Sequence, residues 1–383
     1  GKLIDVILVA LEEGQPNSRN RALKALSLVV ESDPELLNLP AVQEGVEERL
    51  LDSHSSVREA AIDLVGKYMV RNKKYAMIYF WKVLERIRDT GLSVRKRVII
   101  IMRDLIRQQP DFEHLDKIHL QILGRITDEE ASVQDLVKSC FGDFFFSYEK
   151  SRESKPMPIL EDDAFHRTTH LVALHKEISS NVRLLGQARV LMRGLLTRDT
   201  DSKSKGNDTA TVKLIENRNK IARMMCSCLL DSLLQMHEEE SYSDEKLLPI
   251  IRTLHTFCQI DPKLCVPQDA QAKYIQTLRP YVAFSKDHAS QNMDSAAAVM
   301  QCILSILASI FPHVSRPPSN LVDSLAGDLH AIALRHQFLG VVSKSVECLA
   351  ILSKITGLAR KYFVYILQQH HKGLEISRSQ IDR

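Results

Sequence analysis

Two histidines one helical turn apart are the residues in this sequence of 383 whose spacing most suggests catalysis. His166 and His170 stand at i and i+4, and Asp162 and Asp163 come just before them. Side chains so spaced can hold a divalent cation on one face of a helix. The residues between the two histidines, however, lack the glutamate that serves as general base in zinc proteases of this pattern. We therefore expect histidines that face solvent, and neither a metal ion nor another cofactor.

Other catalytic signatures are missing from the sequence. It contains no GxxxxGK[ST] phosphate loop, no GxSxG nucleophile motif and no GxGxxG dinucleotide motif. The acidic run Glu238–Glu240 is better explained as a solvated helix end than as a catalytic pair. We predict that the chain is not an enzyme.

Basic residues, in contrast, are concentrated in one place. Residues 67–107, which we call the basic stretch, contain twelve Lys and Arg against three acidic residues, a net charge of +9 in a chain of net charge +3. Within 93–108, Lys96, Arg103 and Arg107 stand at i, i+7 and i+11 and share one helix face. Cations so arranged can bind phosphates in a way that depends on salt but not on base sequence. Further basic residues lie in the same repeat unit or in the turns before it, namely Lys73, Lys74, Arg86, Arg88, Arg95 and Arg97.

The alternative for the basic stretch is a solvated helix face that keeps the protein soluble. Charge elsewhere is less concentrated, since residues 176–205 carry a net +4 and residues 224–323 a net −4. The stretch of +9 is therefore a localised feature of the chain, and this favours a binding surface.

The helices that must position these cations belong to a sequence repeat. Similar motifs begin at Asp52, Asp89 and Asp128, and each places Val five residues later, followed by Arg58, Arg95 or Gln134. The steps between these last positions are 37 and 39 residues, and a further step of 39 back from Arg58 reaches Arg19. A regular period of this length with two helices in each unit indicates an α-solenoid.

Each repeat unit is predicted to be a helical hairpin. In one unit we expect helices at Ala41–Leu51 and Ser56–Met69. The second of these places apolar residues on one stripe that a single helix cannot bury, so neighbouring units must stack. The stripe consists of Val57, Ala60, Ala61, Leu64 and Val65.

Composition and patterning agree with an all-helical chain. Apolar residues make up 44%, and there are only 14 Gly and 13 Pro. We expect roughly sixteen helices and no strand, arranged as regular repeats over 1–147, a surface loop at 148–163, and less regular helical repeats over 164–383 with a polar loop at 199–211. The seven cysteines are expected to be buried reduced thiols, and the long apolar run Ala296–Phe311 a buried helix and not a membrane span.

Four motifs carry a resemblance to a known family. The stretches DSHSSVREAAIDLVGKYM and ERIRDTGLSVRKRVIIIMRDLIRQQPDF, with ALKALSLVVESDPELL and ITDEEASVQDLVKSCF, resemble the HEAT repeats of the cohesin loader family (Nipped-B, or adherin). The resemblance is close over residues 20–147 and looser but collinear afterwards. It implies a hook-shaped, right-handed superhelical stack of antiparallel helix pairs. It also implies a structural ladder between neighbouring repeats, made by Asp52, Arg58, Asp89, Arg95 and Asp128.

The resemblance also implies a function, and it implies a DNA-binding patch made of Lys73, Lys74, Arg88, Lys96, Arg97, Arg103 and Arg107. Members of the family bind double-stranded DNA together with the ATPase heads and the kleisin of cohesin, stimulate ATP hydrolysis, and act on chromatin in the nucleus without an active site of their own. Their small tetratricopeptide subunit is expected to bind a segment that precedes this chain. The alternative is another HEAT-repeat scaffold, such as a transport receptor or a phosphatase scaffold. A transport receptor would be acidic on its inner face, and the basic stretch argues against that.

Overall fold

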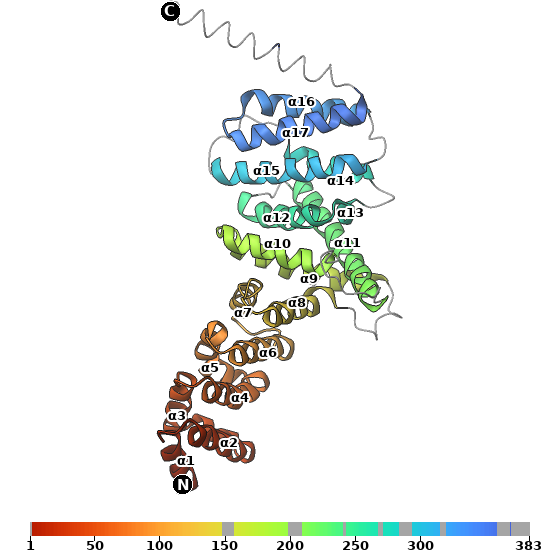
Figure 1. The fold of residues 1–383 in the computed structure, drawn as a ribbon. Coiled ribbons are helices and arrows are strands. Elements are labelled where there is room, and N and C mark those ends of the chain that lie inside the picture. The colour runs from red at the N-terminus through yellow and green to blue at the C-terminus, as the bar shows by residue number, and fades with distance from the viewer. Residues whose placement is uncertain are drawn as a thin grey trace, which may run out of the picture. The chain divides into compact units, whose positions relative to one another are not determined.

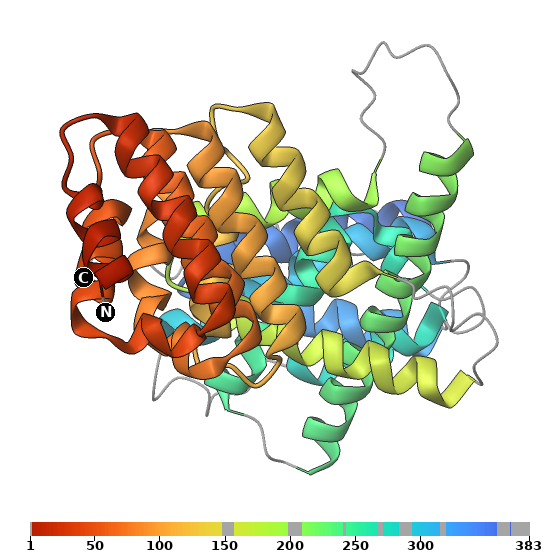
Figure 2. The same ribbon diagram turned by 90° about the horizontal axis from the view of Figure 1, so that it is seen from below.

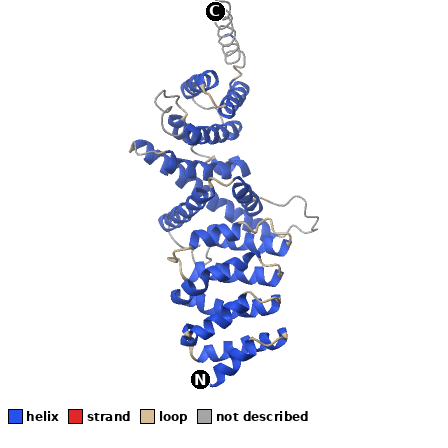
Figure 3. Cartoon of the chain, turned by 90° about the vertical axis from the view of Figure 1, so that its left-hand side faces the viewer, coloured by secondary structure: helices blue, strands red, loops and turns tan. Residues whose placement is uncertain are grey.

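The regular secondary structure of the described residues is entirely helical. The computed structural model describes residues 2–147, 157–197, 209–239, 243–266, 271–282, 293–314 and 319–357, together with residue 368. Within these ranges it contains seventeen α-helices, four short 3-10 helices and no strand (Figure 3). The predicted all-α solenoid is confirmed, with one helix more than the sequence suggested.

The chain divides into two compact units, residues 1–143 and 144–383. In the first unit the helices form consecutive antiparallel pairs, and the last helix continues three residues past the division. They are α1 (Lys2–Leu11), α2 (Pro16–Ser32), α3 (Pro40–Leu50), α4 (Ser55–Arg71), α5 (Lys73–Glu85), α6 (Leu92–Gln108), α7 (Leu115–Leu123) and α8 (Ala131–Phe146).

The helices of the first unit form two layers. The first helices of the pairs (α1, α3, α5 and α7) stack on one side and the second helices (α2, α4, α6 and α8) on the other (Figures 1 and 2). The apolar stripe of α4 lies between them, since Val57, Ala61, Leu64 and Val65 are at most 1% exposed. Ala60, the fifth residue expected in the stripe, lies half-buried at its edge. Burial of such stripes is the main source of stability in a stack of repeats.

Two helices of the first unit end just before an X-Pro pair. Helix α2 ends at Ser32, just before Asp33 and Pro34, and α6 ends at Gln108, just before Gln109 and Pro110, because proline disfavours helical geometry in the residue before it. The amide of Gln109 then donates to the carbonyl oxygens of Met69 at 2.8 Å and Val70 at 3.0 Å. It thereby satisfies acceptors at the end of α4 and joins α6 to that helix.

The second unit is also a stack of helices, of less regular length. It contains α9 (Met157–Ile178), α10 (Val182–Leu196), α11 (Thr209–Glu238), α12 (Asp244–Ile260), α13 (Pro262–Cys265), α14 (Gln271–Leu278), α15 (Met293–Ile310), α16 (Ser319–Arg335) and α17 (Leu339–Thr356). Four of them form one continuous layer, since α10 packs on α12, α12 on α15 and α15 on α17 (Figure 1).

Both expected loops are shorter than the sequence suggested. Helix α9 begins at Met157, so the last residues of the predicted loop 148–163 are helical. Pro158 falls in the first turn, where its missing N–H costs no hydrogen bond, and it is therefore a start signal and not a breaker. Helix α11 begins at Thr209, inside the predicted loop 199–211. The remaining loop residues, 148–156 and 199–208, lie outside the described ranges.

Helix α15 is the long apolar segment noticed in the sequence. Residues Ser295–His313 are the one stretch in the described ranges that is long and apolar enough to cross a membrane, and about half of this stretch is buried inside the protein. The helix packs between α12 and α17, and Ile303, Leu304, Ile306 and Leu307 are fully buried. These contacts are those of a core helix.

All seven cysteines are free thiols, and five of them are buried. The sulfur atoms of Cys226 and Cys265 lie 3.7 Å apart, well beyond the length of a disulfide bond. Burial raises the pKa of Cys140 and of Cys348 to about 12, so both stay protonated and unreactive at neutral pH.

Candidate nucleic-acid interface

A buried arginine at the start of each second helix joins one repeat to the next. Arg58 donates from Nε to Asp89 Oδ2 at 2.8 Å and from Nη2 to Asp89 Oδ1 at 2.5 Å. Its Nη1 donates to the carbonyl oxygens of Asp52 at 2.7 Å and Ser53 at 3.1 Å. The planar guanidinium group thus fixes the loop of its own repeat and, bidentately, the aspartate of the following one.

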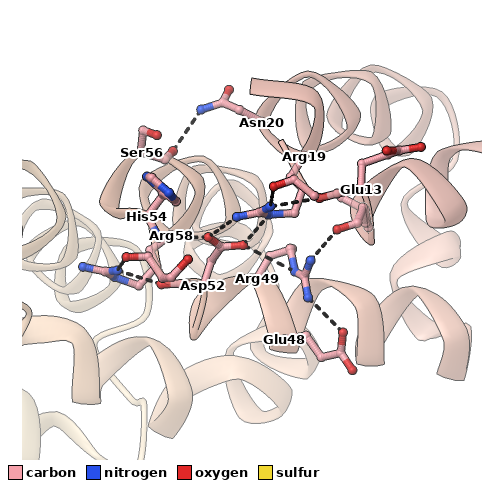
Figure 4. A network of polar contacts seen from close by, with 12 residues as sticks. Glu13, Arg19, Asn20, Glu48, Arg49, Asp52, His54, Ser56 and Arg58 are labelled. Atoms are coloured by element: carbon pink, nitrogen blue, oxygen red, sulfur yellow. Dashed lines mark hydrogen bonds and ion pairs between the residues drawn. The ribbon is translucent and has the colours of Figure 1, made fainter. Parts of the chain in front are cut away.

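The same arrangement recurs on both sides of Arg58. Arg19 binds both carboxylate oxygens of Asp52 at 2.7 and 2.8 Å, and Arg95 binds Asp128 at 3.1 Å. Each aspartate also accepts a backbone N–H two residues ahead, as Asp52 does from His54 at 2.9 Å. Figure 4 shows Arg19 and Asp52 at the centre of this network. The structure therefore brings together all five ladder residues named from the sequence.

A second arginine approaches each ladder aspartate from its own repeat. Arg49 lies 3.8 Å from Asp52, and the equivalent residues Arg86 and Arg125 lie three positions before their own aspartates, at 3.9 and 2.8 Å. Sequence reasoning missed these three, although the R-x-x-D spacing is repeated and could have revealed them. Burial alone would raise the pKa of Asp52. Hydrogen bonds from Arg19 and from the N–H of His54 outweigh it and hold the pKa below its usual value.

The ladder ends at Gln134, which replaces arginine in the fourth repeat. Gln134 donates from Nε2 to the carbonyl oxygen of Asp128 at 2.7 Å, and this is the bond that Arg58 makes to Asp52. An amide keeps this inner contact but has no second set of donors for a further aspartate. Gln134 therefore ends the ladder with an uncharged side chain that needs no aspartate from a following repeat.

The seven predicted DNA-binding residues are carried by α5, α6 and the short connection between them. Lys73 and Lys74 begin α5, Arg88 follows its end, and Lys96 and Arg97 lie in the first turns of α6. Arg103 and Arg107 lie in the second half of α6. A helix of 17 residues is about 25 Å long, so the cations spread along α6 instead of meeting at one point. Arg88 and Arg107 are exposed, whereas Lys96, Arg97 and Arg103 are half-buried.

Acidic residues from neighbouring repeats accompany most of these cations. Arg107 lies 2.7 Å from Asp143 of α8, and Arg97 forms an ion pair with Asp63 of α4. Arg103 is 2.8 Å from Asp104 on its own helix. Lys73 and Lys74 lie 3.9 Å from Asp111 and 3.6 Å from Glu35.

Two of the seven cations have no acidic partner. Arg88 donates to the side-chain oxygen of Gln121 at 3.1 Å. Within the described ranges, Lys96 makes no ion pair or hydrogen bond. The net charge counted along residues 67–107 therefore overstates the charge of the folded surface, because four of the five acids that pair with these cations stand about one repeat away in the sequence.

The histidines with metal-like spacing do not converge. His166 and His170 are exposed on α9, whereas His175 is buried on the same helix, with Nδ1 3.0 Å from the carbonyl oxygen of Leu171 and Nε2 3.2 Å from the hydroxyl of Thr256. No group of three possible ligands occurs in the described part of the chain. Burial, followed by the charges of Arg252 and Arg189, lowers the pKa of His175 to about 4.

Comparison with known proteins identifies the relatives of the chain. A family model for the HEAT repeat associated with sister chromatid cohesion matches residues 24–65. Nipped-B-like protein A of Danio rerio is 30% identical over 91% of the chain, and the Nipped-B protein of Drosophila melanogaster is 30% identical over 98% of it. The chain spans 14% and 17% of the lengths of these two relatives.

A solved structure shows the same fold. The C-terminal fragment of the Chaetomium thermophilum cohesin loader SCC2 aligns with 100% of this chain and 26% of its own length, with a TM-score of 0.73 at 19% sequence identity.

Proposed function

Because the chain belongs to the Nipped-B family of cohesin loaders, we propose that it is a non-enzymatic scaffold that helps load cohesin onto double-stranded DNA. In this proposal the cations of α5 and α6 bind DNA phosphates, and other surfaces of the solenoid bind the ATPase heads and the kleisin of cohesin, thereby stimulating ATP hydrolysis. The proposed location is chromatin in the nucleus.

The exposure of the ion pairs supports a role for the basic stretch in DNA binding. The side chains of Lys73 and Asp111 are 55% and 81% exposed, and those of Lys74 and Glu35 are 57% and 74% exposed. Pairs so accessible to water contribute only about 0–1 kcal/mol. A phosphate can therefore displace the carboxylate at little cost, and Lys96 is available without any exchange. Each cation along α6 would then neutralise one phosphate of the duplex.

Binding to a random-sequence duplex over a range of salt concentrations tests this proposal. Each neutralised phosphate contributes about −0.9 to the slope of log K against log salt, so we expect a slope of about −4. The triple variant Lys96→Glu, Arg103→Glu, Arg107→Glu should bind more weakly with a shallower slope. It should also lower DNA-stimulated hydrolysis by cohesin.

A matched control places the same change of charge elsewhere. Lys246, Lys263 and Lys354 are exposed residues of the second unit, and their replacement by Glu should leave the slope nearly unchanged. If both triple variants lose binding equally, only net charge matters and the assignment to α6 is wrong. An unchanged slope in the α6 variant would show that the cations of this helix serve solubility or a protein partner.

A further inference from the structure

Helix α10 presents cations that no acidic residue of the described ranges neutralises. Its fifteen residues include Arg183, Arg189 and Arg193 and no Asp or Glu. All three arginines are exposed, and their guanidinium groups make no hydrogen bond or ion pair within the described ranges. This distinguishes α10 from the basic stretch, where neighbouring repeats supply a carboxylate for most of the cations.

The arginines share their helix face with exposed valines. At 100° per residue, positions 182, 186, 189, 190 and 193 fall on one side of α10, and Arg183 stands at its edge. Val182 is 84% exposed and Val190 is 53% exposed. Single exposed apolar residues are common. Two within one turn of three unpaired arginines make a mixed face that can bind an amphipathic partner.

Two cations of other helices in the layer that contains α10 lie near the same histidine as Arg189. Arg252 of α12 and Lys344 of α17 lie near His255, and together with Arg189 they add to burial in lowering the pKa of that histidine to about 4. The four helices of this layer contain few acids. Glu347 pairs with Lys344 at 2.7 Å, and the other acids are Asp244, Glu245 and Asp294 at the helix starts. The positive charge of this layer is therefore concentrated on α10, because the charges of α12 balance and α15 has one acid and no Lys or Arg.

We propose that this face, which we call the α10 surface (Val182, Arg183, Arg189, Val190 and Arg193), docks an acidic amphipathic segment of a partner protein. Carboxylates of the segment pair with the arginines, and its apolar side chains cover the two valines. A DNA backbone would satisfy the arginines but would leave Val182 and Val190 against a charged, hydrated partner. Since the three arginines of α10 make no hydrogen bond or ion pair within the described ranges, binding to these residues displaces only water. This surface is separate from the one proposed for DNA and does not depend on it.

Two designed peptides of equal composition test the proposal. One is a helix of about 18 residues with glutamates on one face and leucines on the other, and the second scrambles the same residues so that neither kind shares a face. Fluorescence anisotropy of the labelled peptides with the full chain should show tighter binding of the amphipathic peptide. The variant Arg189→Glu, Arg193→Glu should weaken this binding about tenfold or more, and Val182→Ser, Val190→Ser should weaken it severalfold.

Controls separate the α10 surface from general charge. Arg21 and Lys24 of α2 are exposed and unpaired within the described ranges, so Arg21→Glu, Lys24→Glu makes the same change of charge and should leave peptide binding unchanged. Equal binding of the two peptides, or an unchanged affinity after reversal of Arg189 and Arg193, overturns the proposal. If reversal of Arg189 and Arg193 weakened duplex binding but not peptide binding, the proposal would also be overturned, because the α10 surface would then bind nucleic acid. None of these outcomes bears on the proposal that α6 binds DNA, which the salt series tests separately.

Discussion

Arg58 shows how a charged side chain is kept inside a stack of apolar helices. Its side chain is 8% exposed, and carboxylate oxygens of Asp89 and carbonyl oxygens of the preceding loop accept its hydrogen bonds. A buried ion pair gains little net stability over apolar residues of the same size, but removing one partner leaves an uncompensated charge. We infer that the ladder mainly fixes the register of one repeat against the next.

This balance gives a prediction for Asp89. Asp89→Ala leaves Arg58 buried without its carboxylate, and we expect the free energy of unfolding of the first unit to fall by about 3–5 kcal/mol. Glu31→Ala removes the exposed partner of Lys67 and should change it by less than about 1 kcal/mol. Urea unfolding, with hydrogen exchange to follow α4 and α6 separately, measures both. Equal losses in the two variants would contradict a special role for the buried pair.

The sequence identified residues that recur in a repeated motif, but it did not identify residues whose only relation is a contact in the folded structure. Asp52, Asp89 and Asp128 could be picked out because the same motif surrounds each of them. The carboxylates beside Arg97 and Arg107 could not, because Asp63 and Asp143 occupy other repeats and carry no motif. Charge counted along one stretch is therefore a poor guide to the charge of a stacked surface.

At the scale of elements, the contact between α4 and α6 depends on the absence of a side chain. A Cβ atom added to Gly66 would lie 2.3 Å from Cδ1 and 2.8 Å from Cγ1 of Ile101, which is itself 3% exposed. Two helices can approach this closely only when one of them has no side chain at the crossing. Gly66 therefore sets the distance between successive repeats at this level.

Replacing Gly66 tests the tightness of this contact. Alanine is the better helix former, so an unconstrained Gly66→Ala would stabilise α4 by about 1 kcal/mol. We expect a loss of about 1–3 kcal/mol instead, because the methyl group overpacks the interface. In the double variant with Ile101→Ala the new methyl has room, so the two changes should cost less together than the sum of the single variants. Additive costs would show that Ile101 does not limit the spacing.

Helix positions followed from periodicity, but helix starts depended on local chemistry. The pair Ala41–Leu51 and Ser56–Met69 was placed within one or two residues of α3 and α4, because an apolar stripe and flanking polar residues mark both ends. The start of α9 was missed because Pro158 and a run of charges resemble a loop. The same residues are compatible with a first helical turn, and sequence pattern alone does not separate these two cases.

At the scale of the whole molecule, the two units should respond differently to acid. Burial lowers the pKa of His175 and of His255 to about 4, and both lie in the second unit. Unfolding returns them to about 6.5. The unfolded chain then binds protons that the folded unit does not, so stability falls as pH drops from about 6.5 toward 4. By pH 5 each histidine should cost about 2 kcal/mol.

Hydrogen exchange of the chain at pH 7 and pH 5, corrected for the intrinsic exchange rates, checks this expectation. The second unit should lose protection in this interval, and His255→Leu should remove about half of that loss. In the first unit the pKa of Asp52 is lowered, so its contribution is lost only as pH falls below about 4. Equal loss of protection in both units between pH 7 and pH 5 would contradict the assignment to these histidines.

The distribution of charge over the molecule was only partly visible in the sequence. The stretch 176–205 carries less than half the net charge of the basic stretch, yet it includes the arginines of α10 that fold into no ion pair. The basic stretch has the higher net charge in the sequence, but most of its cations are paired in the fold. The arginines of α10 belong to the stretch of lower net charge and are the more available for binding. Stacking explains the difference, since α4 and α8 supply acids to α6 and no acid of the described ranges pairs with α10.

The ladder also has a consequence for synthesis on the ribosome. Each arginine leaves the exit tunnel more than thirty residues before the aspartate that receives it, as Arg95 does before Asp128. A newly made repeat thus holds a guanidinium group without its acceptor until the next repeat has emerged and docked. Completion passes in this way from Arg19 toward Gln134, whose amide is satisfied within its own repeat. Once α8 has emerged from the tunnel, the ladder from Arg19 to Gln134 can therefore close without any following helix.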